Sequence, residues 1–101
     1  MAGPESSVEA GRVDRWLFFA RLCKSRSLAA HLCEDGLVKV DGVVAIRPAH
    51  AVRPGSTIEV TLGRQVHRVR VRALGLRRGP APEARALYEE LGRVPVVDDW
   101  G

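Results

Sequence analysis

The sequence predicts a single α+β domain in which two helices come first, short antiparallel strands follow, and a further helix ends the fold. Three observations predict this order. Residues 13–20 carry apolar side chains at helical spacing, residues 38–46 have the pattern of a strand hairpin, and residues 65–73 alternate between apolar and basic side chains. A chain of 101 residues suits one domain with a modest core.

The charge distribution favours an anionic partner. Sixteen Lys and Arg stand against twelve Asp and Glu, a net charge of +4, and residues 60–82 carry six arginines and no acidic residue. This distribution is typical of proteins that bind a polyanion such as nucleic acid. No apolar run reaches the roughly 18 residues of a membrane span. Residues 1–10 have no basic or apolar signal region, so they are expected to form a disordered leader.

The first helix is predicted by four apolar residues at i, i+3, i+4 and i+7 spacing: Val13, Trp16, Leu17 and Ala20. Asp14 suits the positive end of the helix dipole. Arg15 and Phe19 lie roughly opposite the apolar stripe, with Phe18 beside them. We expect these two rings either to be covered by another element, such as the C-terminal helix, or to form a stacking platform for an unpaired base.

The second helix is predicted to begin after Ser25, whose hydroxyl can accept an otherwise unpaired backbone N–H. Ala29, Leu32 and Cys33 form its expected inward face. Gly36 supplies the left-handed residue that ends such a helix.

Cys23 and Cys33 are predicted to be reduced packing residues of a cytoplasmic protein, since both fall in apolar helical pattern and no export signal precedes them. Two other roles are disfavoured. A zinc site with His31 would lack a fourth ligand, and a Cys23–His31 nucleophile and base would have to come from separate helices. The sequence therefore predicts no metal site, no cofactor and no enzymatic activity.

The strands begin with Val38–Val40, followed by Asp41-Gly42, a strong hairpin turn signal, and a return strand at 43–46. Residues 56–62 and 65–73 predict two further strands. Alternation in the last of these places His67, Val69, Val71 and Ala73 on one face and Arg68, Arg70 and Arg72 on the other. An arginine row with a spacing of about 6–7 Å is either solvated or follows the phosphates of a nucleic acid.

The C-terminal helix is predicted to begin near Pro82, which is tolerated in a first turn, and to end at Gly92. Its expected stripe comprises Ala84, Leu87, Tyr88 and Leu91. Residues 92–101 are predicted to be an acidic tail.

In its order of signals the sequence resembles the ribosomal protein S4-type RNA-binding domain. The matching positions are Arg12-Val13-Asp14, Trp16-Leu17, Ser25-Arg26, Ala29, Gly36, Val38, Val40-Asp41-Gly42, Pro48, Val52, Pro54-Gly55 and Ile58. Beyond this core, one bacterial subfamily, the small ribosome-associated heat-shock proteins, is resembled at Arg77-Arg78, Pro80, Glu83, Ala84 and Leu87-Tyr88-Glu89-Glu90.

The resemblance implies that residues 11–91 form an S4-like domain, in which two helices pack on a small, mostly antiparallel sheet as in the αL motif. It implies a non-enzymatic protein that binds structured RNA. The expected partner is ribosomal RNA of the large ribosomal subunit, and the expected role is rescue or recycling of stalled subunits. We expect a cytoplasmic monomer with no membrane contact and no small-molecule substrate.

The RNA-binding residues that the resemblance implies are Arg12, Arg15, Lys24, Ser25, Arg26 and Lys39, with His31 as a further candidate. The row of Arg68, Arg70 and Arg72 is a second candidate surface. The start of the second helix offers unpaired backbone N–H groups and a positive dipole end, so the cations beside it are expected to form a phosphate cradle.

Two other classes of function stay open. A short turn between two helices is also typical of a DNA-binding helix-turn-helix, although no long basic recognition helix is evident. A protein-interaction module whose arginines meet an acidic partner is the other. Members of the subfamily tend to end in a long basic extension, whereas this sequence ends in an acidic segment that could fold back on the basic surface and compete with RNA.

Overall fold

The structure, a computed structural model, describes residues 10–96. The predicted leader at 1–9 and the last five residues of the predicted tail, 97–101, lie outside the described residues. The helices are α2 (Val13–Phe19), α3 (Arg26–Glu34) and α4 (Ala81–Arg85). The strands are β1 (Gly11–Arg12), β2 (Val38–Val40), β3 (Val43–Val44), β4 (Ala51–Val52), β5 (Thr57–Leu62), β6 (Gln65–Val71) and β7 (Tyr88–Pro95).

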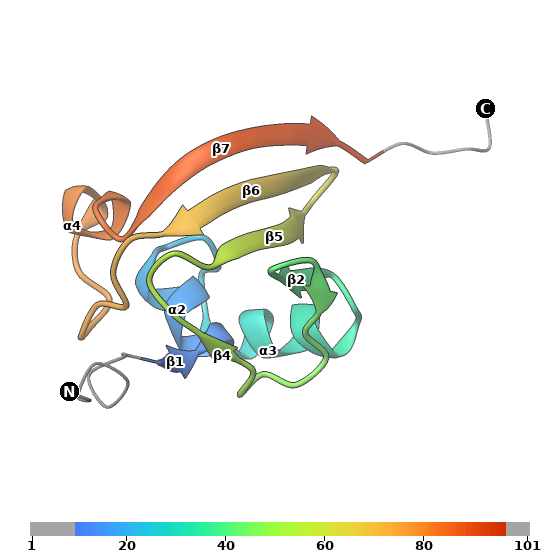
Figure 1. The fold of residues 1–101 in the computed structure, drawn as a ribbon, viewed down its shortest axis with the longest axis horizontal. Coiled ribbons are helices and arrows are strands. Elements are labelled where there is room, and N and C mark those ends of the chain that lie inside the picture. The colour runs from blue at the N-terminus through green and yellow to red at the C-terminus, as the bar shows by residue number, and fades with distance from the viewer. Residues whose placement is uncertain (1–9, 97–101) are drawn as a thin grey trace, which may run out of the picture.

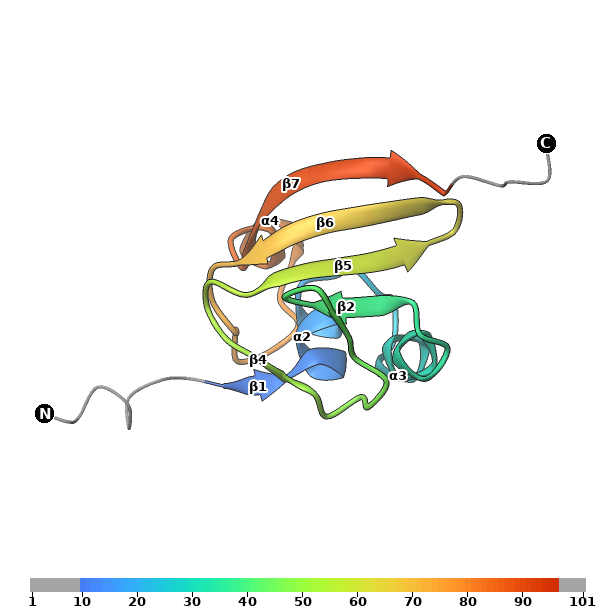
Figure 2. The same ribbon diagram turned by 45° about the vertical axis from the view of Figure 1, so that its right-hand side comes forward.

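The main sheet has five antiparallel strands in the order β3-β2-β5-β6-β7. Helices α2 and α3 lie on one side of this sheet, and β1 pairs separately with β4 (Figure 1). Strand β7 forms the edge farthest from that small pair (Figure 2). The predicted α+β arrangement of two helices on a mostly antiparallel sheet is confirmed. Across residues 10–96, no helix has the length and apolar composition needed to cross a membrane.

The core lies between the helices and the sheet. The predicted stripe of α2 is buried, each side chain at most 2% exposed: Val13, Trp16, Leu17 and Ala20. The sheet contributes every second residue of its central strands: Val38, Val40, Ile58, Val60, Val69 and Val71. Because strand side chains alternate between faces, Lys39, Arg68 and Arg70 lie on the outer face, away from the helices.

Local signals set the ends of the first elements, as predicted. The Ser25 hydroxyl oxygen accepts the backbone N–H of Leu28 at 3.0 Å and so caps α3. Gly36 has φ +77°, the left-handed conformation that ends a helix. Asp41 and Gly42 both have positive φ, 52° and 84°, as a two-residue hairpin of type I′ requires.

The predicted C-terminal helix is wrong beyond Arg85. Strand β7 follows instead and pairs along the whole of β6, from Gln65 opposite Pro95 to Val71 opposite Tyr88. Gly92, the expected end of a helix, lies within this strand. The physical reason is that β6 would otherwise have an unpaired edge, and this long-range pairing outweighs the helical spacing of the apolar residues.

Candidate nucleic-acid interface

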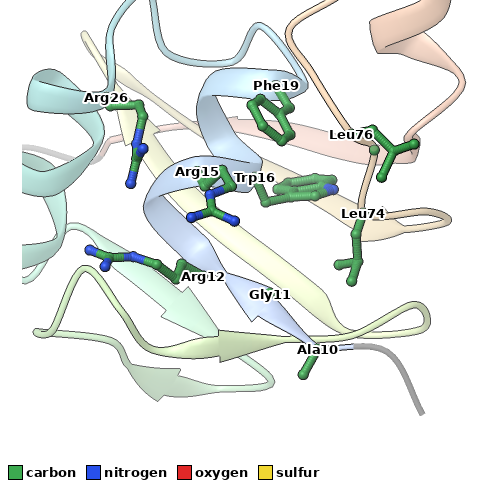
Figure 3. Close-up of a pocket in the computed structure, with 10 residues that line it drawn as sticks. Ala10, Gly11, Arg12, Arg15, Trp16, Phe19, Arg26, Leu74 and Leu76 are labelled. Carbon is green, nitrogen blue, oxygen red and sulfur yellow. The ribbon is translucent and has the colours of Figure 1, made fainter. Parts of the chain in front are cut away.

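Three arginines from three different elements meet at one pocket. Arg12 lies in β1, Arg15 in the first turn of α2, and Arg26 at the start of α3. Their side chains line one side of a pocket of about 430 Å³, and we call them the arginine cluster (Figure 3). The rest of the pocket is mostly apolar, and we call its four larger side chains the apolar wall: Trp16, Phe19, Leu74 and Leu76.

The buried carboxylate of Asp14 lies beside two side chains of the arginine cluster, those of Arg12 and Arg26. Its side chain is 5% exposed and accepts hydrogen bonds from Nε and Nη2 of Arg12, both at 3.0 Å. Nη2 of Arg26 lies 3.7 Å from the same carboxylate. The backbone N–H of Arg15 donates to it at 2.6 Å. The hydrogen bond and the negative charge of Asp14 both raise the pKa of Arg12.

The cluster keeps an excess of positive charge that faces solvent. Arg12 and Arg26 each have a side chain 45% exposed, and Arg15 is exposed as well. Among the described residues, Arg15 has no ion-pair partner. Three positive charges against one carboxylate leave a net charge of +2, so an anion such as a phosphate can meet several guanidinium donors at once.

Three other residues that were predicted to bind RNA lie outside the pocket. They are near the arginine cluster in sequence or on α3. Ser25 uses its hydroxyl oxygen to cap α3. Lys24 is exposed in the joint before it. His31 is exposed in the last turn of α3. Lys24 adjoins the start of α3, so it can add charge next to Arg26.

The remaining predicted residues form a second, separate surface. Lys39 lies on the outer face of the sheet opposite Glu59, which is also 3.6 Å from Arg68. Arg70 lies 3.6 Å from Glu89 on the neighbouring strand. Arg72 follows the end of β6 and is exposed. Because carboxylates are interspersed with these cations, the row is not a continuous positive track.

The two phenylalanines of α2 have different environments. The guanidinium carbon of Arg78 lies 4.7 Å from the ring centroid of Phe18, and its Nε donates to the Phe18 carbonyl oxygen at 3.1 Å. Phe19 is half-buried and lines the pocket. The segment before α4 therefore covers part of the Phe18 ring. The sequence of this segment has no periodicity that would have predicted the contact.

Both cysteines are packing residues, as predicted. Cys23 is 1% exposed and Cys33 is fully buried, and burial raises the pKa of each thiol to about 11. A thiol with this pKa is protonated near neutral pH and is a poor nucleophile. Within residues 10–96, no three His, Cys, Asp or Glu side chains are grouped so that they could hold a metal ion.

Known proteins are similar to this chain in sequence and in fold. Residues 11–58 match the S4 domain family. A heat shock protein 15 homolog of Aeromonas salmonicida is 39% identical over 90 residues, a match that covers 89% of this chain and 67% of that protein. Heat shock protein 15 of Escherichia coli is 38% identical over 79 residues, covering 78% of this chain and 59% of that protein.

Two further relatives match over most of their own length. An RQC P-site tRNA stabilizing factor of Halalkalibacterium halodurans is 31% identical over 87 residues, covering 84% of this chain and 94% of that protein. The trimeric structure of Vibrio cholerae heat shock protein 15 has a TM-score of 0.76 at 36% identity and covers 81% of this chain and 82% of that one. All three residues of the arginine cluster lie inside the segment that matches the S4 domain, residues 11–58.

Proposed function

Because the chain belongs to the S4 domain family and is similar to heat shock protein 15 along most of its length, we propose that it binds structured RNA through the arginine cluster. One observation carries this proposal: three guanidinium groups from β1, α2 and α3 line the same pocket. Guanidinium forks match the geometry of phosphate oxygens better than ammonium groups do. The fold brings them together from three consecutive elements.

The binding mode that this surface suits is contact with the RNA backbone. Asp14 holds Arg12 in a fixed geometry, so less side-chain freedom is lost when a phosphate docks. Lys24 and the positive end of the α3 dipole both lie at the turn between α2 and α3, and both add to the attraction for a phosphate. Such contacts read the shape of the RNA more than its sequence.

The salt dependence of binding tests this proposal. Three to four neutralised phosphates give a plot of log affinity against log salt with a slope of about −2 to −3.5. The slope is measured by titrating a labelled RNA hairpin at several salt concentrations, with a DNA duplex of equal charge as competitor. A slope near zero, or equal competition by the DNA duplex, would contradict the proposal.

We propose that the RNA is ribosomal RNA of the large subunit, and that the protein acts in the cytoplasm in the rescue or recycling of stalled subunits. Support comes from the similarity to heat shock protein 15 and from a relative named for stabilising P-site tRNA. We further propose that the protein acts as a monomer in this role, in contrast to the trimeric structure of the Vibrio cholerae relative.

Sedimentation through a sucrose gradient tests the target. The protein is expected to travel with purified large ribosomal subunits, and the variant Arg15→Ala/Arg26→Ala is expected to stay at the top of the gradient. Equal sedimentation with small and large subunits would show that the large subunit is not selected.

A further inference from the structure

A contact between the arginine cluster and the RNA backbone would use only one half of the pocket. The other half is the apolar wall, in which Phe19 is half-buried and Leu76 is 98% exposed (Figure 3). Leu74 approaches from the side of β1, 3.6 Å from where a Cβ on Gly11 would lie. The pocket of about 430 Å³ thus has a cationic side and an apolar side within reach of one ligand.

We infer that this pocket takes one unpaired nucleotide of the bound RNA, with its phosphate on the arginine cluster and its base against the apolar wall. The inference rests on the proposed function. A nucleotide carries an anion and a flat, largely apolar base joined by a sugar, which matches the two sides of the pocket. The volume also lies in the range of pockets that hold small organic groups, roughly 300–1,000 Å³.

Packing fixes the inner part of the apolar wall: Phe19 and Leu74 pack against the core, whereas the Leu76 side chain is 98% exposed. Gly75 has φ +76°, and a Cβ at this position would lie 3.0 Å from a methyl group of Leu87. Nε of Arg21 donates to the carbonyl oxygen of Gly79 at 2.6 Å. A base therefore meets an inner wall that is already ordered, which lowers the entropy cost of binding.

The indole of Trp16 forms the innermost, fixed part of this wall. Its Nε1–H donates to the carbonyl oxygen of Ala73 at 2.9 Å, and the residue is 1% exposed. The ring is therefore not free to swing out toward RNA. The contacts with a base fall to Phe19, Leu74 and Leu76, which lie farther out in the pocket.

An unpaired base is required, because the bases of a continuous duplex are stacked and their faces are covered by neighbours. The structure therefore assigns a preference for RNA with a bulge or loop over a fully paired stem. This preference separates the inference from the proposed function, which requires only backbone contacts.

The test compares two hairpins that differ by one unpaired nucleotide in the stem. The parent protein is expected to bind the bulged hairpin about tenfold more tightly, as stacking of one base allows. Leu76→Ser is expected to reduce this preference about threefold to fivefold and to leave binding of the paired hairpin unchanged. Because Leu76 is 98% exposed, its replacement should not affect folding.

The matched control is Ile46→Ser, which changes an apolar residue 60% exposed and outside the pocket, and it is expected to keep the full preference. A 2-aminopurine at the bulge reports stacking directly, and its fluorescence should change less with Leu76→Ser than with the parent. Equal affinity for both hairpins, or an unchanged preference in Leu76→Ser, would overturn the inference and leave the proposed function standing. Failure of the parent to bind either hairpin would overturn both.

Discussion

Replacing Arg15 and Arg26 together by alanine is expected to weaken binding to structured RNA by about 100-fold at low salt, since each loses charge-assisted hydrogen bonds to phosphate. Both side chains line the pocket, and both are exposed enough that the fold should tolerate their removal. Affinity is measured by fluorescence anisotropy with a labelled hairpin, and circular dichroism checks that the variant is folded.

The matched control removes the same charge from another place. Arg64 lies in the turn between β5 and β6, Arg85 lies in α4, and both are exposed. The double variant Arg64→Ala/Arg85→Ala is expected to lose less than about threefold in affinity, because only the long-range attraction falls. If the two double variants lose the same affinity, binding reflects net charge and not the cluster.

Replacing Asp14 by alanine is expected to lower the free energy of unfolding by about 2 kcal/mol, because charged hydrogen bonds are lost. The carboxylate is buried and accepts hydrogen bonds from the Arg12 side chain and the Arg15 backbone. This decrease in the free energy of unfolding is smaller than for breaking a fully buried ion pair, because Arg12 and Arg26 are partly exposed and water can solvate them. Urea denaturation measures the change.

Two further variants make the Asp14 result specific. Asp14→Asn keeps an acceptor but not the charge, so its loss is expected to be about half as large. Glu34→Ala removes an exposed carboxylate at the end of α3 and is expected to change stability by less than about 0.5 kcal/mol. An Asp14→Ala protein as stable as the parent would show that Asp14 does not organise the cluster.

The elements that the sequence predicted well are those set by local chemistry. The stripe of α2, the cap at Ser25 and the turn at Asp41-Gly42 each depend on residues close in sequence, and each is present. Strand β7 was missed because the apolar residues from Ala84 onward fit helical spacing, and its partner β6 is distant in sequence. The short pair β1–β4 was missed because its two strands are distant in sequence.

The candidate site was predicted in part. The resemblance identified Arg12, Arg15 and Arg26, but only the fold could show that they share a pocket. Asp14 was interpreted as a partner of the helix dipole, since an i, i+2 contact to Arg12 has no periodic signature. Leu74 and Leu76 lie in a segment without pattern, so this part of the apolar wall had no sequence signal, whereas Phe19 was already a candidate for stacking on an unpaired base.

RNA is proposed to bind on the helical side of the molecule, at the arginine cluster, and not on the outer face of the sheet. Binding of one labelled hairpin, measured side by side for Arg15→Ala/Arg26→Ala and Arg68→Ala/Arg70→Ala, tests it most directly. The expected loss of affinity is about 100-fold for the first variant and less than about threefold for the second. A severe loss in the sheet variant with near-parental binding by the cluster variant would contradict it.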